Sequence, residues 1–167
     1  MNRSDPALRE QVAVLLPRLR RFARTLTRHA ADADDLVQVT VERALVRLDQ
    51  WQPDTRLESW MFKIMKNAWI DEVRARVRRA RVLAPEEAGV NVGDCSADAQ
   101  MTAMSVEAAM ALLPEEQRIA VALVLVEGLS YKEAAAVAEI PTGTLTSRLA
   151  RGREALTRML SDGGGAS

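Results

Sequence analysis

The stretch from Leu129 to Leu156 constrains the fold more than any other part of the chain, because it encodes two short helices separated by a tight turn. Ser130 and Glu133 have the spacing of a capping box, in which the serine hydroxyl accepts from a backbone N–H and the glutamate reaches back. Pro141 ends this helix, since proline lacks an N–H donor and disfavours helix in the residue before it. A second helix restarts at about residues 142–144. This pattern predicts a helix-turn-helix, whose second helix can enter a DNA major groove.

The second of these helices has separate apolar and polar faces. Leu145, Leu149 and Leu156 recur at the spacing of a face that packs inward. A plain helical hairpin with a solvated basic face is the alternative interpretation of this pattern. The side chains that could donate hydrogen bonds outward are Thr144, Ser147, Arg148, Arg151 and Arg153.

The run LSYKEAAAVAEIPTGTLTSRLARGR resembles the promoter-reading helix-turn-helix of extracytoplasmic-function (ECF, group IV) sigma factors of the sigma-70 family, whose usual form is similar to LSYxEIAxxLGIPxGTVKSRLxRAR. It departs from that form at Glu139, where glycine is usual, at Thr146, where a basic residue is common, and at Gly152, which replaces an alanine. The resemblance implies that the second helix reads the duplex −35 element of a promoter. The residues that it assigns to this DNA are Thr144, Thr146, Ser147, Arg148, Arg151 and Arg153.

Charge is balanced over the chain but unevenly distributed. Lysine and arginine total 23, and aspartate and glutamate also total 23. Residues 1–28, 60–81 and 142–160 carry net charges of +5, +5 and +3, whereas the intervening residues 29–59, 82–109 and 110–141 carry −4, −5 and −3. Alternating basic and acidic blocks favour a protein with separate faces for separate partners.

Two amphipathic helices are expected in the N-terminal part of the chain. Apolar residues at three-to-four spacing predict the first from about Ala7 to Arg28, with Pro17 expected to kink or split it. We interpret its arginine face (Arg18, Arg21, Arg24 and Arg28) as solvated, with contact to a partner as the alternative. Acidic residues from Asp32 to Asp35 suit the start of the second helix, which is expected to run to about Leu48.

The run DADDLVQVTVERAL in this second helix resembles DAEDLVQETFLRAW, the sigma-factor segment that docks on the coiled coil of the largest RNA polymerase subunit. Val39 stands in place of a customary acid. The resemblance implies that this chain binds core RNA polymerase. The residues that it assigns to core polymerase binding are Asp34, Asp35, Leu36 and Gln38.

A third helix is predicted from about Arg56 to Arg79, after a second capping box formed by Thr55 and Glu58. Its inward residues are expected to be Leu57, Trp60, Met61, Ile64, Met65, Ala68, Val73 and Val77. Its other face would present Lys63, Lys66, Asn67, Arg74 and Arg78. Basic side chains that follow a backbone, with aromatic and amide groups nearby, suit single-stranded DNA. We nevertheless interpret the aromatic residues Trp60, Phe62 and Trp69 as core residues.

The run TRLESWMFKIMKNAWIDEVRARVRR resembles the sigma-factor element that melts the promoter and captures a flipped base. The resemblance implies a base pocket in the loop at about Asp49 to Arg56, before this helix. The residues that it assigns to the −10 strand are Trp60, Lys63, Lys66, Asn67, Asp71, Arg74 and Arg78.

These elements predict an all-α protein with two small helical domains. Residues 1–80 would form the promoter-melting and polymerase-binding domain, 81–100 a flexible linker, 101–162 the helix-turn-helix domain and 163–167 a disordered tail. Met104, Ala108 and Leu112 are expected to share the inner face of the first helix of the second domain, and Pro114 to begin the next helix, which Gly128 ends.

Metal, cofactor and enzyme sites are not indicated. His29 is the only histidine and Cys95 the only cysteine, so no metal cluster or internal disulfide is expected. A phosphate loop and a nucleophile elbow are also lacking. We predict no cofactor and no catalytic residue, a cytoplasmic location and no insertion into a membrane.

The resemblance implies an alternative sigma factor that binds core RNA polymerase and promoter DNA, opens the promoter and is held by an anti-sigma factor when it is not needed. We expect it to be monomeric when free. The alternative is an autonomous repressor or activator, dimeric through its N-terminal helices, which would pair two recognition helices on a palindrome. A protein-only adaptor is a third possibility, but it would leave the arginines of the recognition helix without a role.

Overall fold

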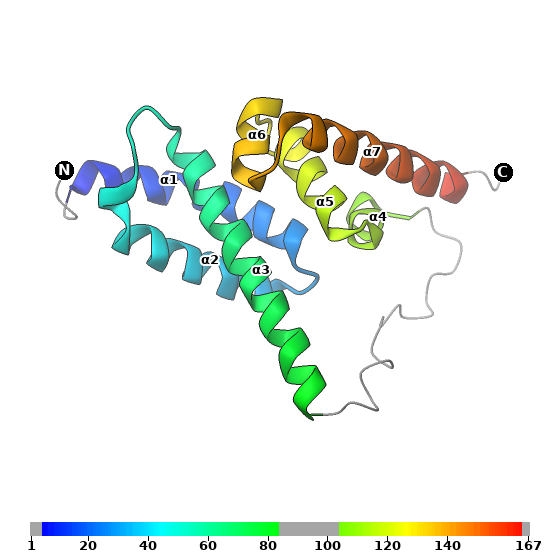
Figure 1. Cartoon of the computed structure of the whole chain (residues 1–167), viewed down its shortest axis with the longest axis horizontal. Coiled ribbons are helices and arrows are strands. Elements are labelled where there is room, and N and C mark those ends of the chain that lie inside the picture. The colour runs from blue at the N-terminus through cyan, green and yellow to red at the C-terminus, as the bar shows by residue number, and fades with distance from the viewer. Residues whose placement is uncertain (1–4, 84–103, 165–167) are drawn as a thin grey trace.

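A computed structural model describes residues 5–83 and 104–164. The described chain is all-helical and contains no strand (Figure 1). It therefore confirms the predicted fold class. The elements of the first domain are α1 (Pro6–Leu26), α2 (Ala30–Val46), the 3-10 helix η1 (Leu48–Gln50) and α3 (Leu57–Leu83). Those of the second are α4 (Val106–Leu112), α5 (Glu115–Val121), the π-helical turn η2 (Ala122–Val126), α6 (Tyr131–Ala138) and α7 (Thr142–Gly164).

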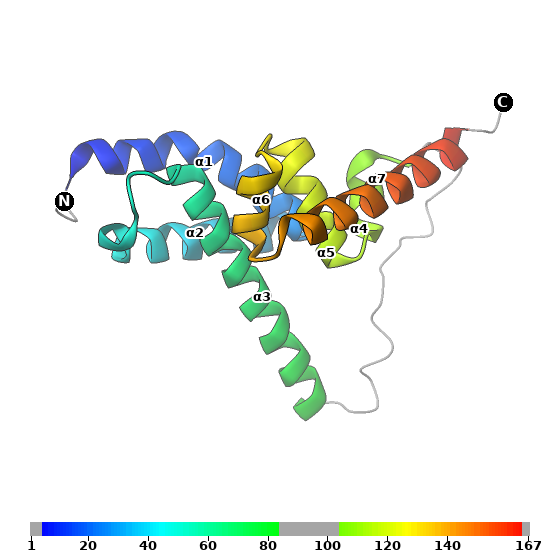
Figure 2. The same ribbon diagram turned by 45° about the horizontal axis from the view of Figure 1, so that its top comes forward.

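The first domain packs α1, α2 and the first half of α3 around a shared apolar core, whereas the second half of α3 extends away from it (Figures 1 and 2). Phe22 of α1 and Phe62 of α3 make an edge-to-face contact, with ring centroids 5.1 Å apart. Pro17 lies inside α1 and does not split it, in contrast to one of the two outcomes expected from the sequence. Val77, predicted to be inward, lies on the extended half of α3 and is 47% exposed.

The second domain is built around the predicted helix-turn-helix of α6 and α7. Ser130 and Glu133 form the predicted capping box at the start of α6. Gly128 adopts a positive φ of 72°, so it ends the preceding helix as predicted. The inner face of α4 was predicted wrongly: Ala109 and Met110 are buried, whereas Ala108 and Leu112 are exposed. Because α4 is short, its orientation follows its contacts with α7 and α1 rather than its own periodicity.

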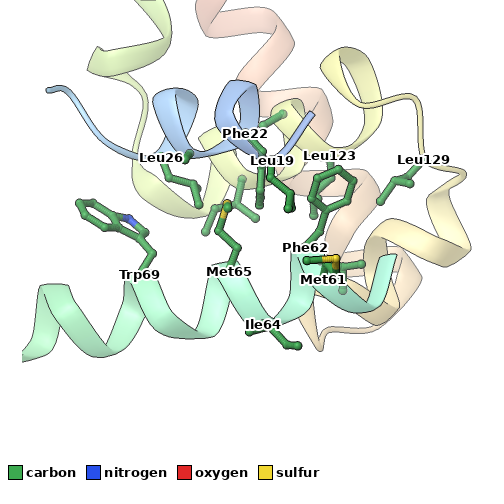
Figure 3. Close-up of a cluster of buried hydrophobic side chains, with 14 of the residues drawn as sticks. Leu19, Phe22, Leu26, Met61, Phe62, Ile64, Met65, Trp69, Leu123 and Leu129 are labelled. Atoms are coloured by element: carbon green, nitrogen blue, oxygen red, sulfur yellow. The ribbon is translucent and has the colours of Figure 1, made fainter. Parts of the chain in front are cut away.

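The two domains pack directly against each other. Helix α3 lies against α6, and α1 contacts α4, α5 and η2. Leu123 and Leu129 of the second domain join Phe62 and Met61 of α3 in one buried cluster (Figure 3). The hydrophobic core is therefore continuous across the domain boundary.

Several sequence predictions concern residues outside the described ranges. Most of the predicted linker, including Cys95, and the last residues of the predicted tail lie there. Within the described ranges, α3 continues to Leu83, past the predicted boundary at residue 80, and α7 continues to Gly164. Among the described helices, none is both long and apolar enough to span a membrane.

Candidate nucleic-acid and polymerase interfaces

The N-terminal half of α7 presents a polar surface that its buried leucines hold in place. Leu145 and Leu149 are 0% and 2% exposed, and they fix the rotation of α7 on the rest of the domain. Thr144 and Arg148 are half-buried. The predicted −35 residues that this rotation leaves exposed are Thr146, Ser147, Arg151 and Arg153.

Several of these polar side chains bond within their own domain. Thr146 Oγ1 donates to the Thr142 carbonyl at 2.9 Å, and Ser147 Oγ donates to the Gly143 carbonyl at 3.1 Å. The Arg148 guanidinium lies 3.5 Å from the Glu116 carboxylate. A hydroxyl bonded to its own helix can turn outward at little cost, because the alternative acceptor is water or a ligand.

The part of the predicted −10 surface around Lys63 and Lys66 on α3 packs against the second domain. Lys66, predicted to point outward, is only 4% exposed, and this prediction is wrong. Glu139, at the end of α6, places its carboxylate 3.3 Å from Lys63 Nζ and 3.6 Å from Lys66 Nζ. The sequence could not show this burial, because the covering surface comes from a segment about seventy residues later in the chain.

Burial and charge act in opposite directions on this group of side chains. Desolvation lowers the pKa of the Lys66 amine, and the nearby Glu139 carboxylate only partly offsets it. Burial alone would raise the pKa of Glu139, but Lys66, Lys63 and the Asn67 side chain together lower it. The charged carboxylate is therefore stabilised by α3, whereas the charge on Lys66 is costly in this packing.

The remaining predicted −10 residues lie along α3. Trp60 is half-buried and packs against the core. Asp71 is exposed, 3.6 Å from Arg43 of α2. Arg74 and Arg78 are exposed on the half of α3 that extends from the body of the molecule (Figure 1).

A cavity of about 290 Å³ lies between α3 and the second domain. Its walls include Ile70 and Val73 from α3 and Ile119 and Leu145 from the second domain. Its charged lining residues are Lys66, Arg74, Glu115, Glu116 and Arg148. The cavity therefore joins predicted −10 and −35 residues in one interdomain space.

The predicted polymerase-binding surface on α2 is mostly exposed. Asp34, Asp35 and Gln38 are exposed, but Leu36 is 6% exposed and packs in the core, so Leu36 itself is not a surface contact residue. A groove of about 600 Å³ runs between α1 and α2 beside these residues. The residues lining it are Leu16, Arg20, Arg24, Asp34, Val37, Gln38, Val41 and Glu42.

The contribution of α1 to this groove was missed by the sequence reasoning. Leu16, Arg20 and Arg24 recur every four residues and so form one stripe along α1. The four-residue spacing indicates that these side chains share one face of α1. It does not indicate that α2 lies beside that face.

A cluster of ion pairs at the domain interface was also missed. Glu127 has a fully buried side chain, and its carboxylate accepts from Arg18 and Arg21 of α1 at 3.3 and 2.8 Å. Arg18 also pairs with Glu58, which is itself paired with Arg56. These partners correct two predictions: the α1 arginines are not simply solvated, and Glu58 forms ion pairs instead of the predicted capping interaction with Thr55.

The described residues offer no cluster of three histidine, cysteine, aspartate or glutamate side chains that could hold a metal ion. The arrangement consists instead of two helical units, each with a polar or basic helix suited to nucleic acid. The fold and these surfaces thus define a two-domain helix-turn-helix protein.

Comparison with known proteins narrows this class of protein to a family. Residues 12–66 match the family model described as the sigma2 domain of PhyR, and residues 103–156 match sigma-70 region 4. The chain is 36% identical to the ECF RNA polymerase sigma factor EcfG of Rhodopseudomonas palustris over 92% of its own length and 85% of that protein. It is 37% identical to SigM of Mycobacterium tuberculosis over 85% of its length and 71% of that protein.

Solved structures show a similar arrangement. The sigma factor RpoE, in its complex with the anti-sigma factor NepR from Bartonella quintana, aligns with a TM-score of 0.80 and 29% identity. That alignment covers 94% of this chain and 98% of RpoE. CnrH, in complex with the cytosolic domain of CnrY, aligns with a TM-score of 0.66 and 27% identity over 92% of this chain and 86% of that one. The chain belongs to the ECF RNA polymerase sigma factor family, and its two domains fit promoter recognition and transcription initiation.

Proposed function

We propose that this chain is a group IV sigma factor that binds core RNA polymerase, reads the −35 element with α7 and engages the −10 strand with α3. The observation that carries this proposal is the exposed start of α7, where Thr146, Ser147 and Arg151 face solvent on a helix anchored by buried leucines. A helix presented in this way can enter a major groove. Thr144, Arg148 and Arg153 complete the proposed −35 contacts.

The proposed −10 surface consists of residues along one helix, which allows it to follow a strand. Lys63 and Lys66 would bind phosphates, and Asn67 would bond a base edge. Trp60, Asp71, Arg74 and Arg78 complete the proposed set. Because Lys66 is buried against the second domain, this part of the surface becomes available only after the domains separate. The domain boundaries that this proposal uses are those predicted from the sequence, with α3 extended to Leu83.

We also propose that core RNA polymerase docks at the groove between α1 and α2. The exposed residues Asp34 and Gln38 line this groove, Asp35 is exposed on the same helix, and Leu36 packs that helix into the core. The role is that of a regulatory subunit rather than an enzyme. It is exercised in the cytoplasm together with the polymerase, and the free chain is monomeric.

An anti-sigma factor is a further proposed partner. The similarity to RpoE, solved with the anti-sigma factor NepR, extends over both domains and supports this proposal. If co-purification from the native cell yields polymerase alone under every growth condition, the proposed partner does not exist.

Reconstituted transcription on a promoter library tests the function. The chain alone should show weak DNA specificity, whereas its complex with core polymerase should initiate from a defined subset of promoters. Arg151→Ala should weaken initiation from that subset. A base contact should cost about 1–3 kcal/mol at one position, whereas a phosphate contact should weaken all sequences alike.

Arg158→Ala is the matched control, because Arg158 is an exposed arginine near the other end of the same helix. It should leave promoter choice unchanged. Specific binding of a palindrome by a dimer of the chain, without polymerase, would contradict the proposed function.

A further inference from the structure

Glu139 occupies a backbone conformation that favours glycine. Its φ and ψ are 59° and 43°, in the left-handed region. The Glu139 N–H donates to the Ala136 carbonyl, and the Ile140 N–H donates to the Ala135 carbonyl. This is the hydrogen-bond pattern of a Schellman helix end, at which glycine avoids the steric penalty of a β-carbon. A glutamate at this position is therefore strained, and its side chain needs a separate explanation.

The contacts of the Glu139 side chain supply that explanation. Its carboxylate lies between the amines of Lys63 and Lys66, both on α3 of the other domain. These two pairs span the contact between α6 and α3. Lys66 is nearly excluded from water by this contact, and the Asn67 side chain also lies beside the Glu139 carboxylate.

The Glu139 carboxylate pairs with the two amines to which the proposed function assigns DNA phosphates. Lys63, Lys66 and Asn67 are the central residues of the proposed −10 surface, and an anionic oxygen now binds the two amines. We infer, on the basis of the proposed function, that Glu139 is an intramolecular latch: it competes with the DNA strand for Lys63 and Lys66 and holds the free chain closed over this surface.

The latch acts on one DNA surface and not on the other. Thr146, Ser147, Arg151 and Arg153 on α7 remain exposed in the closed arrangement. The closed chain can therefore still approach duplex DNA through α7, whereas binding of a single strand on α3 requires the two domains to separate. Because of the latch, the two domains must separate before α3 can bind the single strand.

Other contacts also hold the two domains together, and they limit the effect expected from loss of the Glu139 carboxylate. Arg56 pairs with Glu133 at 3.3 Å, and Arg18 and Arg21 pair with Glu127. The continuous apolar core also holds the domains together. Loss of the Glu139 carboxylate should therefore shift the equilibrium between closed and open forms without fully opening the chain.

Two substitutions at one position separate charge from strain. Glu139→Gln removes the charge and keeps the strained backbone. Glu139→Gly removes both, so the end of α6 becomes better formed while the latch is lost. Glu154→Gln is the matched control, because Glu154 is exposed on α7 and has no ion-pair partner among the described residues.

Two properties of the wild type and of each variant are measured at low ionic strength. Small-angle X-ray scattering gives the radius of gyration, and fluorescence anisotropy gives the affinity for a labelled pool of short single-stranded DNA of random sequence. Both Glu139 variants should have a larger radius of gyration than the wild type. Their affinity for the strand should rise about three- to tenfold, the size expected for the loss of one or two competing ion pairs. Glu154→Gln should match the wild type in both measurements.

The outcomes distinguish the latch from the proposed function. If neither Glu139 variant has a larger radius of gyration than the wild type, the latch proposal is wrong, whatever the affinity for single-stranded DNA. If both expand but strand affinity does not rise, Glu139 still holds the domains closed, and it is the assignment of the −10 strand to α3 that fails. A melting temperature for Glu139→Gly at or above that of the wild type excludes misfolding as the cause of expansion.

Discussion

Gly152 lies where α7 passes close to α5 in the second domain. A β-carbon added there would lie 2.7 Å from Cγ2 of Val121 and 3.4 Å from the Gln117 carbonyl oxygen. Glycine at this position therefore allows α7 to cross α5 without a clash. The departure from the family alanine has a physical reason, because the branched Val121 side chain fills the space that a methyl group would need.

Gly152→Ala should lower the free energy of unfolding. Alanine favours a helix by about 1 kcal/mol over glycine, but overpacking costs about 1–3 kcal/mol, so a net loss of about 1 kcal/mol is expected. Urea denaturation measures it. Val121→Ala should restore room for the new methyl group, so the double variant should lose less than the sum of the two single losses.

Gly143→Ala is the control for helix propensity. A β-carbon at Gly143 would meet no atom within 4 Å, although the residue lies in the same helix. This variant should be neutral or more stable. An increase in stability for Gly152→Ala as large as that for Gly143→Ala would show that the approach of α5 and α7 is looser than the structure indicates.

At the scale of elements, the capping box sets where the helix-turn-helix begins. Ser130 Oγ accepts from the Glu133 N–H at 3.1 Å, and the Glu133 carboxylate accepts from the Ser130 N–H at 3.4 Å. The same carboxylate lies near Arg56 of the first domain. One residue therefore both caps α6 and ties it to the other domain.

Ser130→Ala should remove the serine half of this cap and leave the Arg56 contact in place. Loss of an N-cap side chain costs about 1 kcal/mol, which urea denaturation can detect. Ser147→Ala is the matched control, because its hydroxyl bonds to its own helix and alanine is the better helix former. If the two variants lose the same free energy of unfolding, the Ser130 cap does not stabilise the protein more than an ordinary helix hydroxyl does.

For the whole molecule, the buried Glu127 carboxylate is the main electrostatic tie between domains. It bonds Arg18 and Arg21, and the Arg18 guanidinium also donates to the Glu127 carbonyl at 2.7 Å. Arg21 is half exposed, with 52% of its side chain accessible, so it can regain water if the pair is broken. The hydrogen bond and the charge of Glu127 raise the pKa of Arg21, so the Arg21 guanidinium stays charged in this pairing.

Glu127→Gln should loosen the domain interface. Breaking a fully buried pair costs about 3–5 kcal/mol, but solvent access at Arg21 reduces the expected loss to about 1–3 kcal/mol. Differential scanning calorimetry should show the transition broaden or divide into two. Glu42→Gln, on the exposed side of α2, should leave one unchanged transition. A single sharp transition in Glu127→Gln would mean that the apolar core alone couples the domains.

The sequence by itself determined the helices, most of their inner faces and the helix-turn-helix. These features follow from short-range physics: Ser130 caps the residue three positions later, Pro141 ends a helix, and Leu145 and Leu149 lie on one face because a helix repeats every 3.6 residues. The exposure of Ser147, Arg151 and Arg153 on α7 followed from the same periodicity. Short elements such as α4 were less predictable, because few residues define their face.

Only the tertiary structure decided which polar residues are covered. Lys66 and Arg18 have the sequence spacing of exposed residues on amphipathic helices, yet they pair with Glu139 and Glu127 of the other domain. Their partners lie tens of residues away in the chain, and no local pattern encodes such a distance. The burial of a charge depends on the surface that packs over it, so the covering of Lys66 in the proposed −10 surface became visible only once the two domains were placed together.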